Sequence, residues 1–194
     1  MSEGWDDYAE GWDSNPDVVA YSEKAFDSLS DVIDLNDLRV LDFGCGTGLL
    51  TEKISTYAKQ VVALDTSEKM ITILNDKSLS NVSAISEELS ENLVVGNKLF
   101  KEKFDLIIAS SVCGFIPEHE KILTVIKSLL KPTGTFIQWD WLSTRKDGDF
   151  GLNKDAVEKA YINVGLELSN IDVPFSMSSS EGDMPVLMGV AKNT

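Results

Sequence analysis

The sequence predicts an α/β fold built on an open, mostly parallel β-sheet with helices on both faces. Short apolar, strand-like runs alternate with amphipathic, helix-like segments along most of the 194 residues. Residues 104–110 are almost entirely apolar after Asp105, which is typical of a parallel strand covered on both faces. The last two strand-like runs have no helix between them, so we expect one antiparallel strand at that end of the sheet.

The individual elements follow from local signals. Asn15 and Pro16 mark a helix start, and Ser67 is placed to cap another. We expect strands at about 38–43, 60–65, 82–85, 104–110, 135–141, 166–173 and 184–191. We expect helices from residue 16 to about 33, over 47–57, from 68 onward, within 87–100, from 117 to about 130, and over 153–164. The serine-rich residues 176–180 are expected to connect the last two strands.

The run 40–50 carries the clearest functional signal, because a strand leads directly into three glycines at alternating positions. These glycines are Gly44, Gly46 and Gly48. A side chain at these positions would hold a ligand away from the backbone, so the spacing indicates a ligand lying on bare main chain. The next strand ends at Asp65, 21 positions after Gly44. An α/β nucleotide fold places there the carboxylate that binds the ribose hydroxyls.

The spacing G-x-G-x-G differs from the dinucleotide fingerprint G-x-G-x-x-G, whose sixth position is Leu49 here. This difference argues against NAD or FAD. Tight packing of the strand against the following helix is the alternative explanation for the glycines.

Four segments resemble motifs of the class I S-adenosylmethionine-dependent methyltransferases. Residues 42–48, Asp-Phe-Gly-Cys-Gly-Thr-Gly, resemble the first motif, and residues 64–71 the second-strand motif. Residues 104–111 resemble the fourth strand, and residues 129–137 the helix, turn and fifth strand that follow. The motifs occur in the family's order and, with their flanks, cover most of the chain. The resemblance implies a doubly wound, seven-stranded sheet with a reversed C-terminal strand, methyltransferase activity and the cofactor S-adenosyl-L-methionine.

The length and an apolar content of 43% suit a single domain over residues 1–194. We expect an N-terminal lid and helix region at 1–35 and a Rossmann-like core at 36–194. The resemblance implies that Tyr8 and Trp12 cover the sulfonium, where an aromatic face attracts positive charge. An amphipathic stretch that only caps the core is the alternative.

The predicted cofactor residues lie at the carboxyl ends of the strands, one turn into the helix after the second strand, or in the lid. They are Tyr8, Trp12, Asp42, Gly44, Cys45, Gly46, Asp65, Thr66, Met70, Ser86, Glu87, Ala109 and Ser110. The resemblance implies that Asp42 orients the methionine portion, although it could also cap backbone amides. Asp65 could cap the next helix instead of binding the ribose. The resemblance implies that Met70 packs on the adenine face, and an ordinary core methionine is the alternative. Glu87 is expected at the adenine edge or as the first acidic residue of a helix.

The acceptor side offers two candidate bases. Asp140 lies between two tryptophans at the end of the fifth strand, and His119, the only histidine, lies at a helix start. A solvated histidine is the alternative for His119. Many relatives carry histidines in the loop after the fourth strand, where this chain has residues 113–115, Cys-Gly-Phe. We therefore expect an acceptor that is already nucleophilic, such as an amine, thiol or carboxylate.

Four further residues complete this side. Phe115, Trp141 and Phe150 are expected to line an apolar acceptor pocket, and Arg145 could pair with an acidic substrate.

Composition limits the class of partner. The chain has 32 Asp and Glu against 17 Lys and Arg, a formal charge of −15, which disfavours nucleic acid. Its two cysteines suggest neither a metal site nor a disulfide, and no signal peptide or membrane span is apparent. We expect a cytoplasmic protein with a small-molecule methyl acceptor and without a nucleic-acid or membrane partner.

Three alternatives remain open at this point. They are a non-catalytic S-adenosylmethionine-binding sensor or subunit, an NAD-dependent oxidoreductase, and a methyltransferase acting on a macromolecule.

Overall fold

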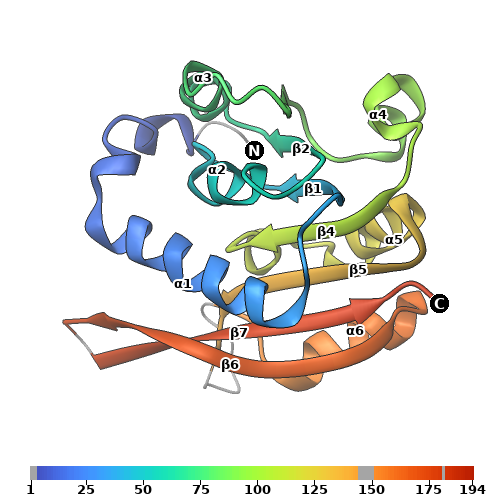
Figure 1. The fold of residues 1–194 in the computed structure, drawn as a ribbon. Coiled ribbons are helices and arrows are strands. Elements are labelled where there is room, and N and C mark those ends of the chain that lie inside the picture. Colours follow the sequence, from blue (N-terminus) through green and yellow to red (C-terminus); the bar gives the residue numbers. More distant parts are fainter. Residues whose placement is uncertain (1–3, 144–150, 181) are drawn as a thin grey trace. The chain divides into compact units, whose positions relative to one another are not determined.

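The computed structural model describes residues 4–143, 151–180 and 182–194. The chain divides into two compact units, Met1–Lys101 and Glu102–Thr194 (Figure 1). The first unit contains the glycine run and Asp65, and the second contains Asp140 and His119.

The first unit contains three parallel strands in the order β3-β2-β1. The strands are β1 (Arg39–Phe43), β2 (Gln60–Asp65) and β3 (Val82–Ser86). The α-helices are α1 (Pro16–Val32), α2 (Leu49–Ser55), α3 (Glu68–Asp76) and α4 (Glu91–Gly96). Three 3₁₀ turns are η1 (Asp6–Tyr8), η2 (Trp12–Ser14) and η3 (Lys98–Phe100).

The strand register in this unit brings its candidate site together. Phe43 pairs with Leu64, and Asp65 pairs with Ser86, so the carboxyl ends of the three strands lie at one edge. Every residue of β1 is buried, as expected for a strand covered on both faces. Ligands bind beyond this edge in open α/β sheets.

The predicted helix starts in this unit are confirmed at two positions. The Asn15 side chain accepts from the Asp17 amide at 3.0 Å at the start of α1. The Ser67 hydroxyl accepts from the Met70 amide at 3.1 Å at the start of α3. Each side chain satisfies an amide that the first helical turn leaves unpaired.

The predicted helix within 87–100 is shorter than expected. The Ser90 hydroxyl accepts from the Leu93 amide at 3.2 Å, and this cap starts α4 at Glu91. The helix ends at Gly96, and a 3₁₀ turn replaces its expected last part. The helix therefore lies within the predicted range 87–100 but occupies only Glu91–Gly96 of it.

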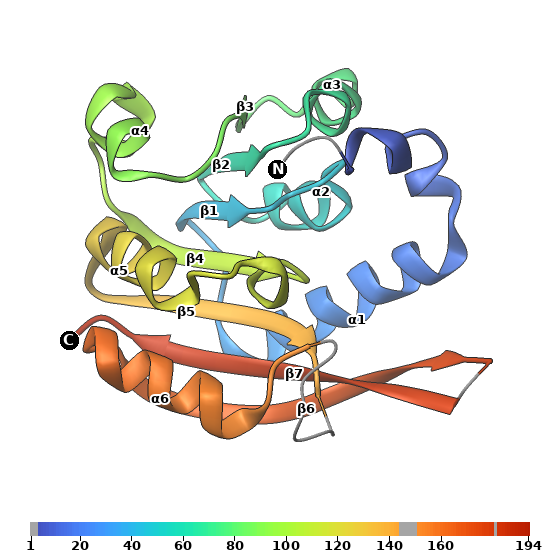
Figure 2. The ribbon, with the colours of Figure 1, turned by 180° about the vertical axis from the view of Figure 1, so that it is seen from behind.

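The second unit contains four strands in the order β4-β5-β7-β6. The strands are β4 (Phe104–Ser110), β5 (Leu130–Trp141), β6 (Glu167–Ser179) and β7 (Gly182–Lys192). The helices are α5 (His119–Leu129) and α6 (Lys154–Val164), with a 3₁₀ turn η4 (Cys113–Phe115). The strands β4 and β5 are parallel, whereas β7 is antiparallel to both β5 and β6. The helices α5 and α6 lie on the same face of these strands (Figure 2).

Two boundaries in this unit differ from expectation. The serine-rich residues expected to be a connection belong to β6, because Ser176 to Ser179 pair with Pro185 to Gly182. The strand β5 begins at Leu130 rather than Thr135, and the pairing with β4 is interrupted between Phe104 and Leu106.

The described part of the chain thus contains seven strands, mostly parallel, with a reversed strand near the C-terminus. The predicted α/β fold class is confirmed. None of the described helices has the length and apolar character that crossing a bilayer requires.

Candidate functional site

The loop between β1 and α2 is the centre of the candidate site in the first unit. Gly44, Gly46 and Gly48 all have positive φ, at 75°, 53° and 83°, a conformation that side chains rarely adopt. The amides of Gly44 and Cys45 both donate to the Leu64 carbonyl, at 2.7 and 3.1 Å. These bonds fix the loop to the end of β2.

Two of the glycines serve different purposes. A Cβ on Gly48 would lie 2.3 Å from Leu74 Cδ1, so this glycine permits close packing of α2 against α3. The alternative considered from the sequence is packing of the strand against the following helix, whereas the close contact at Gly48 is with Leu74 of α3. A Cβ on Gly46 would meet nothing closer than Trp12 Nε1 at 3.9 Å. Gly46 thus presents bare backbone to open space, as a ligand cradle requires.

Asp65 connects this loop to α3. Its Oδ2 accepts from the Gly46 amide at 2.8 Å, and its Oδ1 accepts from the Ser67 amide at 2.9 Å. The side chain is half-buried. A carboxylate offers about four lone-pair positions, so two backbone bonds leave capacity for ligand hydroxyls. Asp65 therefore fixes the loop while keeping acceptor positions for the hydroxyls of a ribose. The side chain that caps α3 is Ser67. The loop 44–48 and Asp65 are together called the cradle.

Asp42 lies beneath the same loop and is 1% exposed. Its Oδ2 accepts from the Thr51 hydroxyl of α2 at 2.6 Å. Burial raises the pKa of Asp42 to about 7, although the Thr51 bond lowers it, and the charge of Asp65 raises it further. The side chain therefore changes charge near neutral pH and is sensitive to a cation bound nearby.

Two predicted cofactor residues have side chains in the core. Cys45 packs against the apolar cluster of Ala63, Ile71 and Leu74, and burial raises the pKa of its thiol well above the usual range. Met70 is 2% exposed, which is the core alternative considered for it.

The end of β3 lies beside Asp65, which pairs with Ser86. The Glu87 amide donates to the Asp65 carbonyl at 3.0 Å, and the Ser86 hydroxyl to the Thr66 carbonyl at 3.5 Å. Glu87 is not the first residue of a helix, since α4 starts at Glu91. Its exposed carboxylate remains a candidate partner for the adenine amine.

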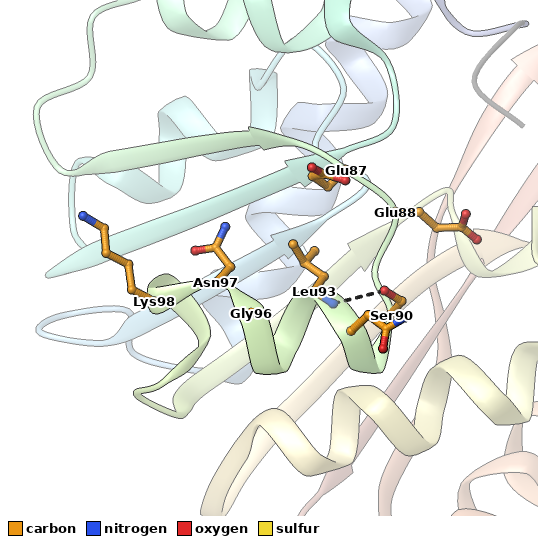
Figure 3. Close-up of a pocket in the computed structure, with 8 residues that line it drawn as sticks. Glu87, Glu88, Ser90, Leu93, Gly96, Asn97 and Lys98 are labelled. Carbon is orange, nitrogen blue, oxygen red and sulfur yellow. Dashed lines mark hydrogen bonds between the residues drawn. The ribbon is translucent and has the colours of Figure 1, made fainter.

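Glu87 also borders a hollow of about 760 Å³ beside α4 (Figure 3). The lining residues are Glu87, Glu88, Ser90, Asn92, Leu93, Gly96, Asn97 and Lys98. Figure 3 shows Lys98 and Asn97 at one end of the hollow and Glu88 and Ser90 at the other. The lining includes Glu87 but neither the glycine loop nor Asp65, so the hollow meets the candidate site only at Glu87.

The N-terminal segment is bonded to the cradle. The Asp13 carboxylate accepts from the Thr47 hydroxyl and forms an ion pair with Lys77 at 2.9 Å. The Asp6 carboxylate accepts from the Ser67 hydroxyl at 2.5 Å, which places η1 against α3. The hydrogen bond from Ser67 lowers the pKa of the Asp6 carboxyl group.

The two predicted lid aromatics differ in position. Trp12 lies nearest to the bare face of Gly46 and contacts Trp5 edge-on, with ring centroids 6.4 Å apart. Tyr8 is 60% exposed and tilts against Trp5. Trp12 is thus the aromatic that borders the cradle, and coverage of a sulfonium by either residue stays a prediction.

In the second unit, β4 ends with Ala109, which is fully buried, and Ser110, which is half-buried. The next residue, Ser111, has a φ of 59°, and its amide donates to the Trp139 carbonyl at 2.7 Å. A non-glycine residue with positive φ is a local strain that occurs preferentially at functional sites.

Asp140 lies on β5 and is 2% exposed. Its Oδ1 accepts from the Gly114 amide at 2.7 Å, and its Oδ2 accepts from the Gln138 side chain at 2.8 Å. Burial raises the pKa of Asp140 to about 7, and these two bonds lower it by less. Such a pKa suits a general base, but both oxygens are already engaged, so the predicted catalytic role stays a prediction.

His119 is the first residue of α5 and is half-buried. Its Nε2 is buried and lacks a hydrogen-bond partner among the residues that the structure describes, so the alternative of a solvated histidine does not hold for this atom. Burial lowers the pKa of His119, whereas Gln138 and then Glu120 oppose that shift. The ring is therefore largely neutral at pH 7, and a role as base stays a prediction.

The predicted acceptor pocket is only partly described. Phe115 is 44% exposed, and Trp141 is half-buried. Phe150 and Arg145 lie outside the described residues.

Several polar residues of both units were missed by sequence reasoning. They are Asp6, Asp13, Thr47, Thr51, Ser67 as a partner of Asp6, Gln138 and Tyr161. Most act on partners far away in the sequence, so no local spacing could identify them.

Comparison with known proteins identifies relatives of this chain. A family model described as "Methyltransferase domain" matches residues 41–138, just over half of the chain. An uncharacterized methyltransferase of Schizosaccharomyces pombe is 28% identical over 128 residues, which are 63% of this chain and 45% of that protein. A protein named ubiquinone biosynthesis O-methyltransferase from Paraburkholderia phymatum is 28% identical over 134 residues, 69% of this chain and 52% of that protein. The chain therefore spans about half the length of these curated relatives.

A solved structure matches nearly the whole fold. The structure titled as a SAM-dependent methyltransferase from Aquifex aeolicus aligns with a TM-score of 0.74 and 19% identity. The alignment covers 97% of this chain and 98% of that one. At this identity the likeness concerns the fold.

Proposed function

Given that this chain belongs to the class I S-adenosylmethionine-dependent methyltransferases, we propose that it transfers a methyl group from S-adenosyl-L-methionine to a small-molecule acceptor. The observation that carries the proposal is the loop of residues 44–48, which is bonded to Asp65 and leaves the face of Gly46 bare.

The residues of the first unit fit the cofactor. The bare backbone at Gly46 admits the ligand, and the remaining lone pairs of Asp65 would accept from the two ribose hydroxyls. Glu87 would accept from the adenine amine, and Trp12 would cover the loop. When bound, S-adenosylmethionine supplies an electrophilic methyl group on a cationic sulfonium.

Asp42 would respond to that cation. A positive charge nearby favours the ionised carboxylate, so cofactor binding would lower the pKa of Asp42 below its value of about 7. Binding at pH 7 would therefore release a proton and would be tighter above pH 7 than below it.

The chain's own contribution to methyl transfer is alignment and exclusion of water. Positioning alone supplies on the order of 7–11 kcal/mol in model reactions. A strong general base is therefore unnecessary for an amine, thiol or carboxylate acceptor. Asp140 and His119 remain candidate bases for a hydroxyl acceptor, which would need one.

The net charge of the chain and the name of one relative support a small-molecule acceptor. A formal charge of −15 repels phosphate backbones, which argues against RNA or DNA. One relative is named a ubiquinone biosynthesis O-methyltransferase, so small molecules with an oxygen acceptor are a reasonable first class to test.

The test has two stages. Isothermal titration calorimetry with S-adenosylhomocysteine and, separately, NADH should give binding of the former alone. A panel of phenols, amines, thiols and carboxylates is then assayed with S-adenosyl[methyl-³H]methionine for label transfer and for release of S-adenosylhomocysteine. Binding of NADH instead would refute the cofactor assignment, and tight cofactor binding without turnover over the panel would favour the sensor alternative.

A further inference from the structure

A chain of buried polar groups links three parts of the second unit. The Tyr161 hydroxyl on α6 donates to Gln138 Oε1 at 2.9 Å, and Gln138 Nε2 donates to Asp140 Oδ2 at 2.8 Å. The Gly114 amide donates to Asp140 Oδ1 at 2.7 Å from the turn η4. Tyr161 and Gln138 are fully buried, and Asp140 is 2% exposed. Burying polar groups this deeply costs folding free energy unless each group has a hydrogen-bond partner, so this row of hydrogen bonds is a specific arrangement.

The chemistry of the groups fixes which of them donates each hydrogen bond and which accepts it. The amide oxygen of Gln138 only accepts, so Tyr161 must be the donor, and the Gln138 amide nitrogen then donates to the carboxylate. Asp140 therefore receives two donors and gives none when it is ionised. Its carboxylate is the point where the chain meets the backbone of the loop.

The loop that Asp140 holds is the one that leaves the carboxyl end of β4. It begins at Ser111, with its positive φ and its bond to Trp139, and it ends at Phe115. A Cβ on Gly114 would lie 3.3 Å from Asp140 Oδ1, so glycine allows the backbone to approach the carboxylate closely. Ligands bind beyond this edge of an α/β sheet, and Phe115 is 44% exposed there.

We propose that Asp140, oriented by Gln138 and Tyr161, is a positioning residue that fixes the loop 111–115 for the methyl acceptor, and that protonation of Asp140 loosens this loop. The role toward the acceptor rests on the proposed function. The hydrogen bonds by which Asp140 fixes the loop are independent of the proposed function.

The sign of the effect follows from the two oxygens. Ionised Asp140 accepts from both Gly114 and Gln138. Protonation turns one oxygen into a hydroxyl donor, which then competes with one of those two bonds. The loop is accordingly held more firmly as the pH rises.

Protonation lies in an accessible range of pH. Burial raises the pKa of Asp140 to about 7. The groups that face it are the Gly114 amide, the Cys113 thiol, the Gln138 amide and, across Gln138, the Tyr161 hydroxyl. On α5, His119 faces Gln138, and Glu120 lies beside His119. Burial lowers the pKa of His119, and the test must separate protonation of this ring from protonation of Asp140.

The first arm of the test is an NMR titration of the ¹⁵N-labelled full chain from pH 5.5 to 8.5. The Gly114 amide resonance should move downfield as the pH rises, with a midpoint near 7. In Tyr161→Phe, the Gln138 amide loses its fixed orientation and donates less well to the carboxylate, so the midpoint should move to higher pH. Tyr57→Phe, an exposed tyrosine of the first unit, is the matched control and should leave the midpoint unchanged.

Two variants assign the titrating group. Asp140→Asn should abolish the Gly114 titration, and His119→Gln should preserve it. A titration that persists in Asp140→Asn, that disappears in His119→Gln, or that is absent from the wild type would overturn the proposal. Tyr161→Phe keeps the test decisive if Asp140→Asn does not fold.

The second arm tests the acceptor role with an acceptor found in the panel. Tyr161→Phe should move the acidic limb of the kcat/KM profile to higher pH by the same amount as the Gly114 midpoint, with unchanged affinity for S-adenosylhomocysteine. A midpoint that moves by about half a pH unit gives roughly threefold lower kcat/KM at pH 6. An unmoved limb together with a moved Gly114 midpoint would overturn the positioning role. Failure of the proposed function would instead appear as a wild-type chain that does not bind S-adenosylhomocysteine.

Discussion

Replacing Asp65 with asparagine is the sharpest perturbation of the cradle. The carboxylate accepts from the Gly46 and Ser67 amides at 2.8 and 2.9 Å, and the proposal adds two ribose hydroxyls. An asparagine side chain would be nearly isosteric but has one acceptor oxygen, and its NH₂ group would face a backbone donor. Asp65→Asn therefore weakens both the ligand bonds and the support of the loop.

The expected loss can be estimated from the bonds involved. A hydrogen bond to a charged group contributes about 1.5–3 kcal/mol, and asparagine retains part of this network. A net loss of about 2–3 kcal/mol in binding free energy corresponds to roughly 30- to 150-fold weaker affinity. Isothermal titration calorimetry with S-adenosylhomocysteine measures this directly, after thermal melting has shown that the variant is folded at the assay temperature.

The matched control is Asp31→Asn, which makes the same change of charge at an exposed position of α1. Its affinity should remain within about twofold of the wild type, because an exposed charge away from the cradle contributes little. If folded Asp65→Asn binds S-adenosylhomocysteine as tightly as Asp31→Asn does, the assignment of the ribose to this carboxylate is refuted.

Three further predictions concern stability and the N-terminal segment. Gly48→Ala combines a positive φ with a Cβ 2.3 Å from a leucine methyl, so urea denaturation should show a free energy of unfolding lower by about 2–5 kcal/mol. Gly96→Ala, whose Cβ would lie in open space, should not lower it. Equal losses in the two variants would contradict the packing argument. The free energy of unfolding should fall as the pH rises from about 4 to about 7, because Asp42 ionises at lower pH in the unfolded chain than in the folded one. Asp42→Asn should make this fall smaller and leave the part due to Asp140. An unchanged slope would show that Asp42 does not titrate as described. Asp13→Asn weakens the ion pair with Lys77 and the hydrogen bond from Thr47, so chymotrypsin should cleave the N-terminal segment severalfold faster. An unchanged rate of cleavage would show that these two interactions do not hold the N-terminal segment in place.

The parts of the fold and site that sequence could predict are those fixed by local chemistry. The alternating glycines, Asp65 at a strand end and Ser67 before a helix are each required by the conformation of their own few residues. The reversed strand β7 followed from the missing helix before it. These features were predicted because the information lies within one element or its immediate neighbour.

The rest depends on contacts between distant segments. The bond between Asp13 and Thr47 joins residues 34 positions apart, and Asp6 meets Ser67 across 61 positions. The serine-rich end of β6 carries no strand signal of its own, and it is extended because it pairs with β7. Burial of Asp140 beneath Gly114 likewise requires β5 and the loop after β4 to be placed side by side. Such pairings are tertiary and have no local pattern.

A crystal structure of the chain with S-adenosylhomocysteine tests the central claim most directly. The account predicts both ribose hydroxyls at about 2.6–3.0 Å from the Asp65 carboxylate oxygens, with the nucleoside against the backbone of Gly46. A nucleoside bound in the hollow beside α4, or at any position from which Asp65 cannot reach the ribose, would contradict it.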